Sequence, residues 1–274
     1  MKRRVGLCSI TSGLLLGYAA SVAAQESESL AQRELLLDPI EVAAEAPGSL
    51  TQPDAEAARE ALRQVPGNTS LITTEDVRKG RVGSLEDILD RSPSVYIQSR
   101  FGGSEQRLSI RGSGLTQTFE SRGVRLLRNG LPLNEADGFT RNQLVDPLII
   151  QHAEVYPGAN ALTYGAATLG GAINLVTPTG YTADRFTAHL EGGSDAWFRG
   201  QAAAGGVWEG TGLDGYASLS GLHQNGFRDA NDAEDTIQFY TNVGYRASER
   251  QEHRLHFTYF EQDLELPGSL TKDQ

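Results

Sequence analysis

Residues 235–262 read DTIQFYTNVGYRASERQEHRLHFTYFEQ, two alternating segments joined by a short polar connection. From Ile237 to Tyr245 every second side chain is mostly apolar or aromatic, and the side chains between them are mostly polar. Leu255, Phe257 and Tyr259 repeat the pattern in the second segment. Successive side chains of a strand point to opposite faces, so this spacing predicts a pair of strands with one apolar face.

Further strands are predicted immediately before this pair, near residues 186–190, 197–208 and 213–222. The longer segments match the ~9–11 residues with which a tilted strand crosses a bilayer. Aromatic residues stand near the strand ends, where a membrane barrel carries its interfacial girdles: Trp197, Phe198, Trp208 and Tyr245.

The connections between these strands alternate in length. Residues 209–212 and 248–252 form short connections, whereas residues 225–235 form a long, acidic one. Short turns on one side and longer loops on the other are typical of outer-membrane barrels. We therefore predict that residues 181–274 are the first strands of a transmembrane β-barrel, with a soluble antiparallel sheet as the alternative.

About five strands fit into this region, but a closed barrel needs at least ~8. Five strands would leave two open edges in lipid, where unpaired backbone groups are not tolerated. The last residues, 270–274, have the composition of an outward loop. We therefore expect the chain to be a fragment or a truncated gene product.

The pattern from residue 53 to residue 180 is different and predicts a compact α+β domain. Residues 54–64 have helical character, and Ser84 is placed to cap a second helix that carries Leu85, Ile88 and Leu89 on one face. Several short apolar runs predict strands, and an Asn-Gly pair at residues 129–130 predicts a hairpin turn. The predicted fold class is thus an α+β domain followed by the first antiparallel strands of a barrel.

The N-terminal residues predict export. Three basic residues at positions 2–4 precede an apolar run, and small residues end it near Ala24, so residues 1–24 form a signal peptide. Its removal takes away Cys8, the one cysteine of the chain, and a disulfide within the mature chain is excluded. Residues 25–52 are polar and acidic, with an apolar island at 37–44, and predict a mobile tail.

Charge and motifs exclude several classes of function. Removing the signal leaves 21 basic residues against 35 acidic ones, and such a chain repels the phosphates of nucleic acids. The sequence has no nucleophile elbow, no Walker A loop and no dinucleotide fingerprint, so we do not expect an enzyme. His253 and His256 would face opposite sides of a strand, which makes a poor metal pair. We expect neither a resident cofactor nor a metal site.

Four motifs in order carry a family resemblance: LSIRG at 108–112, RNGLP at 128–132, VYPGANALTYG at 155–165 and GGAINLVT at 170–177. They resemble the plug signature of TonB-dependent outer-membrane receptors. Within that family the chain is most similar to ferric-citrate and other ferric-siderophore receptors. That finer likeness rests on SRFGG at 99–103, RGSGL at 111–115, NEADG at 134–138 and LPG at 266–268.

The resemblance implies a partner and a location. Residues 37–44 resemble the TonB box, which adds as a strand to the periplasmic protein TonB. The resemblance assigns this contact to Asp38, Pro39, Ile40, Glu41 and Val42, with Ile40 and Val42 as the buried side chains. Pro39 departs from the commoner Thr or Val. The protein would reside in the cell outer membrane with its N-terminal tail in the periplasm.

The resemblance also implies roles for arginines. Arg111 would be a buried guanidinium that holds the plug against acidic residues of the barrel wall, a geometry that suits bidentate pairing. Ferric chelates with carboxylate groups are anionic, so a cationic floor is expected on the outward plug loops. The candidates for contact with the ligand are Gln117, Phe119, Arg122, Arg125 and Arg128.

These implications leave alternatives open. The favoured function is TonB-dependent uptake of a ferric siderophore or a citrate-like ferric chelate, with iron arriving already chelated. The same architecture could carry cobalamin, haem or a saccharide. A truncated, non-transporting plug module is the alternative of a different class.

Overall fold

The structure, a computed structural model, describes residues 48–77, 80–101, 105–113, 123–133, 145–166, 168–228 and 231–266. The chain divides into two units, Met1–Ala44 and Glu45–Gln274, and every described residue belongs to the second unit. The expected signal peptide and the expected TonB box lie outside the described residues. Within the described ranges, no helix is long and apolar enough to cross a membrane.

Short helices in the first part of the chain begin where their capping residues predict. Asp54 caps the first helix by accepting a hydrogen bond from the Ala57 amide at 2.8 Å. Ser84 and Asp87 form a reciprocal capping box at the start of another helix, which confirms the predicted cap. The helical elements are α1 (Ala55–Arg63), α2 (Thr74–Val77), α3 (Leu85–Leu89) and the 3-10 helices η2 (Pro147–Ile149) and η3 (Gly158–Tyr164).

A five-stranded mixed sheet forms the centre of this α+β domain. Its strand order is β1-β6-β7-β4-β5, with only β4 and β7 parallel. Asn129 and Gly130 have φ of 53° and 77° and join β4 to β5, which confirms the predicted hairpin turn. The strands are β1 (Ser70–Thr73), β4 (Val124–Arg128), β5 (Leu131–Pro132), β6 (His152–Pro157) and β7 (Gly171–Val176), beside a separate hairpin of β2 (Val95–Phe101) and β3 (Glu105–Ile110).

The core of the α+β domain lies on one face of this sheet. Ile173 and Leu175 of β7 and Val155 of β6 point into it and are wholly buried. Leu85 and Leu89 of α3 pack against the same cluster. Burial of such side chains contributes about 1.5–3 kcal/mol each, so this cluster is what holds the α+β domain together.

The second part of the chain forms one antiparallel sheet with strands in the order β12-β11-β10-β9-β8, here called the large sheet. The sequence prediction of about five strands is confirmed for the described residues. Its strands are β8 (Thr187–Gly192), β9 (Phe198–Trp208), β10 (Leu213–Gln224), β11 (Glu234–Ser248) and β12 (Gln251–Leu264).

The two faces of the large sheet have the reverse of the polarity expected in a soluble protein. The outer face is apolar and exposed: Leu190 is 73% and Leu255 is 75% accessible. The inner face is polar and buried, with Asp214 and Asn242 at 0% and Ser218 at 2%. A water-soluble sheet buries its apolar face. An apolar outer face with a polar inner face is instead the pattern of a membrane barrel.

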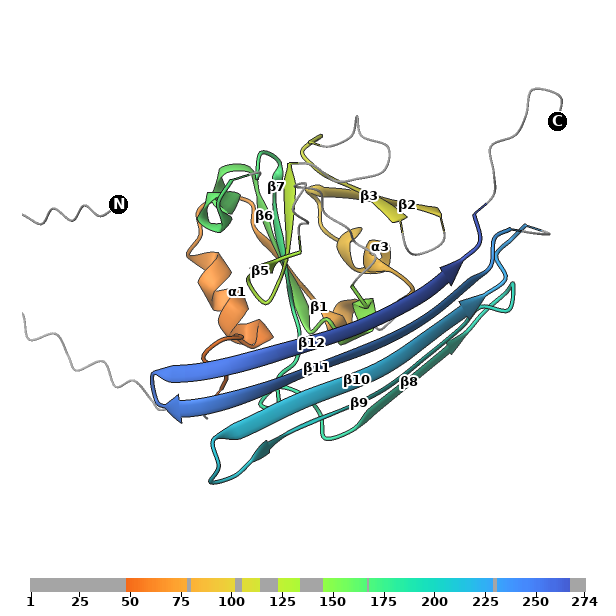
Figure 1. The fold of residues 1–274 in the computed structure, drawn as a ribbon. Coiled ribbons are helices and arrows are strands. Elements are labelled where there is room, and N and C mark those ends of the chain that lie inside the picture. The colour runs from red at the N-terminus through yellow and green to blue at the C-terminus, as the bar shows by residue number, and fades with distance from the viewer. Residues whose placement is uncertain are drawn as a thin grey trace, which may run out of the picture. The chain divides into compact units, whose positions relative to one another are not determined.

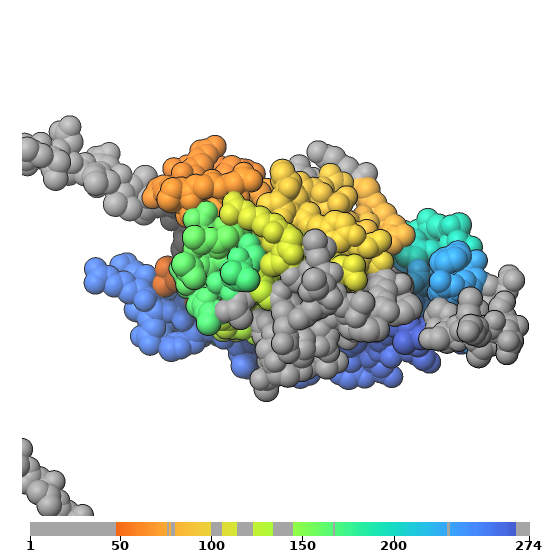
Figure 2. Space-filling view, turned by 90° about the horizontal axis from the view of Figure 1, so that it is seen from above, coloured from red at the N-terminus to blue at the C-terminus, as the bar shows by residue number. Residues whose placement is uncertain are grey.

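The α+β domain lies against the polar face of the large sheet (Figure 1). Seen from above, it sits over the middle of the sheet, and blue and teal strand ends extend beyond it on both sides (Figure 2). Gly180, between β7 and β8, marks the passage from one part to the other. A side chain there would meet the Gly206 carbonyl oxygen at 2.1 Å, so only glycine fits.

Candidate functional site: the seam between the α+β domain and the large sheet

The seam, meaning the contacts between the α+β domain and the inner face of the large sheet, contains three polar groups. The first holds the residues just before α1. The Glu252 carboxylate accepts hydrogen bonds from the Ser49 hydroxyl at 2.7 Å, the Leu50 amide at 2.8 Å and the Thr51 hydroxyl at 2.8 Å. Three donors on one carboxylate fix residues 48–51 against the start of β12.

Arg254 completes this first contact from the same strand. Its guanidinium forms a bidentate pair with Asp214 of β10 at 2.7 and 2.9 Å and also contacts Glu252 at 2.8 Å. The side chains of all three are 0–2% exposed. Asp214 also accepts from the Gly180 amide at 2.9 Å. Asp214, Glu252 and Arg254 thus join the large sheet to Gly180, between β7 and β8, and to the segment before α1.

The second group centres on the Tyr240 hydroxyl of β11. This hydroxyl lies 2.8 Å from the Thr177 hydroxyl, 3.3 Å from the Asn129 amide and 3.0 Å from Nδ1 of His256. Beside it, Arg128 donates to the Thr258 hydroxyl at 2.9 Å and lies 5.3 Å above the Tyr240 ring. The hairpin turn at residues 129–130 is therefore docked on the large sheet.

The third group is a buried ion pair. Arg199 of β9 donates to Asp146 at 2.6 Å and to the Gly83 carbonyl at 2.5 Å, and the side chains of the pair are 5% and 3% exposed. Ser220 of β10 donates to the second Asp146 oxygen. Asp146 also caps η2 by accepting from the Leu148 amide at 2.9 Å. Removing one partner of such a pair leaves a buried charge and costs about 3–5 kcal/mol.

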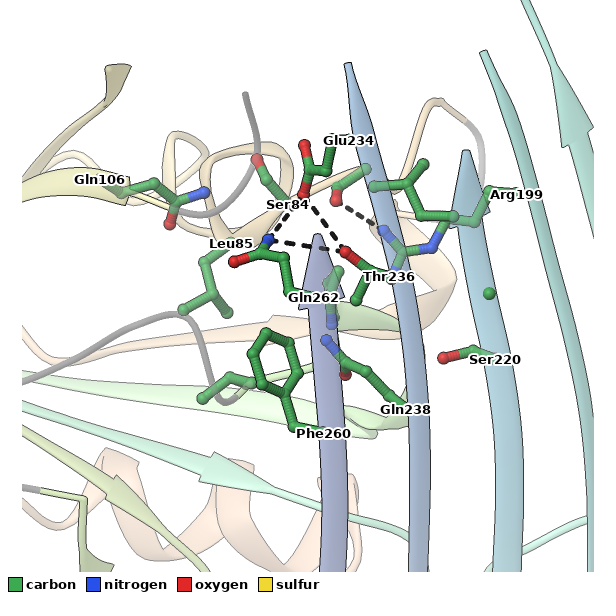
Figure 3. Close-up of a pocket in the computed structure, with 15 residues that line it drawn as sticks. Ser84, Leu85, Gln106, Arg199, Ser220, Glu234, Thr236, Gln238, Phe260 and Gln262 are labelled. Carbon is green, nitrogen blue, oxygen red and sulfur yellow. Dashed lines mark hydrogen bonds between the residues drawn. The ribbon is translucent and has the colours of Figure 1, made fainter. Parts of the chain in front are cut away.

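A narrow polar cavity of about 30 Å³ lies beside this ion pair and is called the Arg199 cavity (Figure 3). Glu234 of β11 accepts from Gln262 of β12 at 2.9 Å at its rim. Labelled side chains from the α+β domain and from four strands line it: Ser84, Leu85, Gln106, Arg199, Ser220, Glu234, Thr236, Gln238, Phe260 and Gln262.

A separate polar network lies inside the α+β domain. Glu154 of β6 is 5% exposed and accepts from Asn174 at 2.9 Å and from Tyr156 at 3.2 Å, and Nε2 of the wholly buried His152 is 3.6 Å away. Burial raises the pKa of Glu154, but His152 and the two hydrogen bonds outweigh that effect. The pKa of Glu154 therefore lies below its ordinary value, and the group is ionised at neutral pH.

The sequence-predicted site residues fall into three sets. Asp38, Pro39, Ile40, Glu41, Val42, Gln117, Phe119 and Arg122 lie outside the described residues. Arg125 donates to the Ala166 carbonyl at 3.0 Å, close to the end of η3. The guanidinium of Arg128, another ligand candidate, contacts Tyr240 and Thr258 of the large sheet, and its contact with a ligand stays a prediction.

Arg111 was expected to hold the plug against acidic residues of the barrel wall, and that contact stays a prediction. Within the described residues Arg111 is exposed, with φ of 53°, and its guanidinium lies beside Gly158. Gly158 follows the end of β6, whereas Ile149, just before the start of β6, packs on the large sheet. A strand of six residues spans about 20 Å. Arg111 therefore lies on the side of the α+β domain away from the large sheet.

Of the four aromatic residues expected near strand ends, three lie on the outer face of the large sheet and one does not. Phe198, Trp208 and Tyr245 are exposed on the outer face, but Trp197 lies under the Arg81 guanidinium at 5.5 Å and faces the α+β domain. His256 contacts Tyr240 on the inner face, whereas His253 is exposed, so the prediction of opposite faces is confirmed.

Sequence reasoning did not single out the ion-paired residues of the seam. Asp146, Arg199 and Asp214 are far apart along the chain, and Glu252 and Arg254, two residues apart, form no motif. One signal was available for those in strands. A charged residue in register with the polar face of a membrane strand must find a partner, because that face is buried on folding.

The fold and the seam define a class: a globular domain that fills the polar side of a sheet of membrane-type strands. Residues 61–172 match the TonB-dependent Receptor Plug Domain family. The chain is thus similar to TonB-dependent receptors, and its α+β domain matches their plug.

Similar proteins agree with this assignment. The chain is 29% identical over 136 residues to the vitamin B12 transporter BtuB of Vibrio vulnificus, covering 49% of the chain and 22% of that transporter. It is 25% identical over 139 residues to the ferrichrome outer membrane transporter/phage receptor of Escherichia coli, covering 50% of the chain and 18% of that protein. The chain therefore spans about a fifth of the length of these relatives.

A solved structure supports the fold. The pyoverdine outer membrane receptor FpvA of Pseudomonas aeruginosa, bound to pyoverdine, aligns with a TM-score of 0.59 and 20% identity. The alignment covers 73% of this chain and 28% of that receptor.

Proposed function

We propose that the chain is the plug-bearing part of a TonB-dependent transporter in the outer membrane, and that its cargo is a ferric siderophore or a citrate-like ferric chelate. One observation carries the transport proposal. The plug fills the polar face of a sheet whose other face is apolar and exposed, an arrangement that lets the sheet contact lipid while the plug blocks the pore.

The cargo proposal rests on motif resemblance and on charge. The plug segment 117–128 supplies three arginines in an otherwise acidic protein, and an anionic chelate needs such cations. Of these arginines, Arg125 stays a ligand candidate by position, whereas Arg128 is engaged with the large sheet. Cobalamin is the second candidate, because two of the curated relatives are vitamin B12 transporters.

The coupling proposal concerns the N-terminal tail. TonB would bind residues 38–42 by strand addition and pull on the tail from the periplasm. Residues 48–51 are the first described residues that this force would reach, and Ser49, Leu50 and Thr51 are bonded to Glu252. The tail would therefore transmit the pull to the contact at the start of β12.

Uptake measurements in a strain that lacks the gene, with and without the gene restored, test the function. We expect restored uptake of one iron-labelled siderophore, dependent on TonB and lost when residues 38–42 are deleted. A strain that loses only cobalamin uptake would overturn the siderophore proposal. Uptake that persists without TonB would overturn the coupling proposal.

A further inference from the structure

Two cavities follow one another along the polar face of β9 and β10. The first is the Arg199 cavity (Figure 3). The second, called the Gln201 cavity, has about 430 Å³ and lies between α1, η2 and the large sheet. A water needs roughly 10–15 Å³ by this measure, so the first cavity holds about two waters and the second many more.

The partition between these cavities is thin. Pro147 lines the Arg199 cavity, whereas the next residue, Leu148, lines the Gln201 cavity. The same alternation occurs on β9, where Arg199 and Gln201 are successive inward residues and each lines one cavity. The single turn η2, pressed against β9 and β10, therefore separates the two spaces.

Polar bonds hold this partition on one side. Asp146 caps η2 and contacts both Arg199 and Ser220, so one carboxylate ties the turn to two strands. On the other side, Ile149 packs against Ala203 and the two tyrosines of the inner face, Tyr216 and Tyr240. Leu148 and Ile150, the residues on either side of Ile149, belong to the plug core, so the polar bonds and Ile149 are what hold the turn to the large sheet.

The lining suits a hydrophilic cargo. The Arg199 cavity has a mixed lining in which amide and hydroxyl side chains form the largest group, and these exchange hydrogen bonds with water or with a polar ligand at little cost: Ser84, Gln106, Ser220, Thr236, Gln238 and Gln262. The Gln201 cavity continues with threonines and with Gln201 itself. The path along β9 and β10 is thus polar on both sides of the partition.

We propose that cargo crosses the plug at this partition, and that the Asp146–Arg199 pair is the bolt that keeps it closed. The proposal rests on the proposed transport function and adds the place and the residues of opening. The bolt opens when η2 moves away from β9, which joins the two cavities into one polar path. Asp146 and Arg199 act on the cargo through the position of η2.

Conductance of the protein encoded by the whole gene, reconstituted in planar lipid bilayers, tests the place of opening without any cargo. Asp146→Asn keeps the shape but leaves Arg199 without its counter-charge, so we expect openings at least about tenfold more frequent than in the wild type. Asp214→Asn is the matched control. Asp214 is also buried and pairs with Arg254 at 2.7 Å, but it lies away from the partition. Equal conductance in the two variants, or none in either, would overturn the proposal.

A pair of cysteines tests whether the partition must open. Asp146→Cys with Ser220→Cys replaces two side chains that already bond across the seam, and oxidation should reduce uptake at least about tenfold, with recovery on reduction. Ala204→Cys with Ala217→Cys is the control. These residues are direct partners across β9 and β10 on the outer face of the large sheet, away from both cavities, and oxidation there should not change uptake.

The outcomes separate the two proposals. Normal uptake by the oxidised Asp146–Ser220 pair would refute the bolt and leave the transport function intact. Absence of uptake in the wild type, together with conductance specific to Asp146→Asn, would refute the proposed cargo. It would still support the proposed role of the Asp146–Arg199 pair.

Discussion

Tyr240 illustrates at the scale of one residue how the plug and the large sheet are joined. Its hydroxyl meets Thr177, which is 63 residues earlier in the chain, and Asn129, which is 111 residues earlier. His256 contacts the same hydroxyl from the neighbouring strand. The tyrosine is 2% exposed, so every partner it loses on substitution is left without water to replace it.

Tyr240→Phe should therefore destabilise the protein by about 1–3 kcal/mol, because it leaves buried donors and acceptors unpaired. Tyr259→Phe is the control, since that hydroxyl bonds to Glu261 on the exposed outer face, and its effect should be within about 0.5 kcal/mol. Urea unfolding followed by tryptophan fluorescence measures both. Equal losses in the two variants would refute the role of Tyr240.

Glu154 should make plug stability dependent on pH. Its folded pKa lies below the ordinary value, so its contribution is complete above the unfolded pKa of about 4.3 and is lost as the pH falls through the folded pKa. Glu154→Gln should lower stability at pH 7 and flatten the decline on acidification. Unfolding midpoints of wild type and variant at pH 7 and below about pH 4 check this, and parallel curves would contradict it.

At the scale of elements, the β4–β5 hairpin depends on backbone conformation rather than on space. A side chain at Gly130 would meet nothing within 4 Å, but its φ is +77°. Gly130→Ala should therefore cost about 1 kcal/mol through backbone strain alone. Gly206→Ala is the control: it also has open space, but its φ lies outside the left-handed range, so no loss is expected. Thermal unfolding distinguishes the two.

The start of β12 is the element that holds the segment before α1. Glu252→Gln should weaken three charge-assisted hydrogen bonds, and the Leu50 amide should exchange with solvent about tenfold faster. Glu261→Gln on the exposed face of the same strand is the control. Hydrogen exchange read by mass spectrometry measures the change. An unchanged rate at Leu50 would show that other contacts hold the segment.

At the scale of the whole molecule, the outer face of the large sheet decides where the protein can reside. Ala188, Ala202, Leu219, Phe239 and Tyr259 form one cross-strand row on that face. Phe239 and Phe257 add an aromatic contact at 6.2 Å between ring centres. This surface is fitted to hydrocarbon, since in water it would be a large exposed apolar patch.

Leu219→Arg places a charge in the middle of this row and should cost about 2–4 kcal/mol in a bilayer. We expect less heat-modifiable protein in outer-membrane extracts. Glu209→Arg, in the short turn after β9, is the control and should assemble normally. Normal assembly of Leu219→Arg would argue that this face does not meet lipid.

The sequence by itself determined the local elements of the fold. Alternation in residues 235–262 predicted paired strands with one apolar face, Ser84 predicted a cap, and an Asn-Gly pair predicted a hairpin, because each depends only on local geometry. Four ordered motifs predicted the plug, and the family match at residues 61–172 confirms it. Such features are set by neighbours a few residues apart.

Only the tertiary structure decided which polar side chains meet. Arg128, which the sequence offered only as a ligand candidate, contacts Tyr240, while Arg199 and Arg254, which form no motif, carry the buried ion pairs. The physical reason is that an arginine is solvated or paired according to which residues the fold places opposite it, and for Arg128 that residue, Thr258, is 130 positions away. Alternation predicted which face of each strand is apolar, whereas tertiary packing alone determined the partners of the polar face.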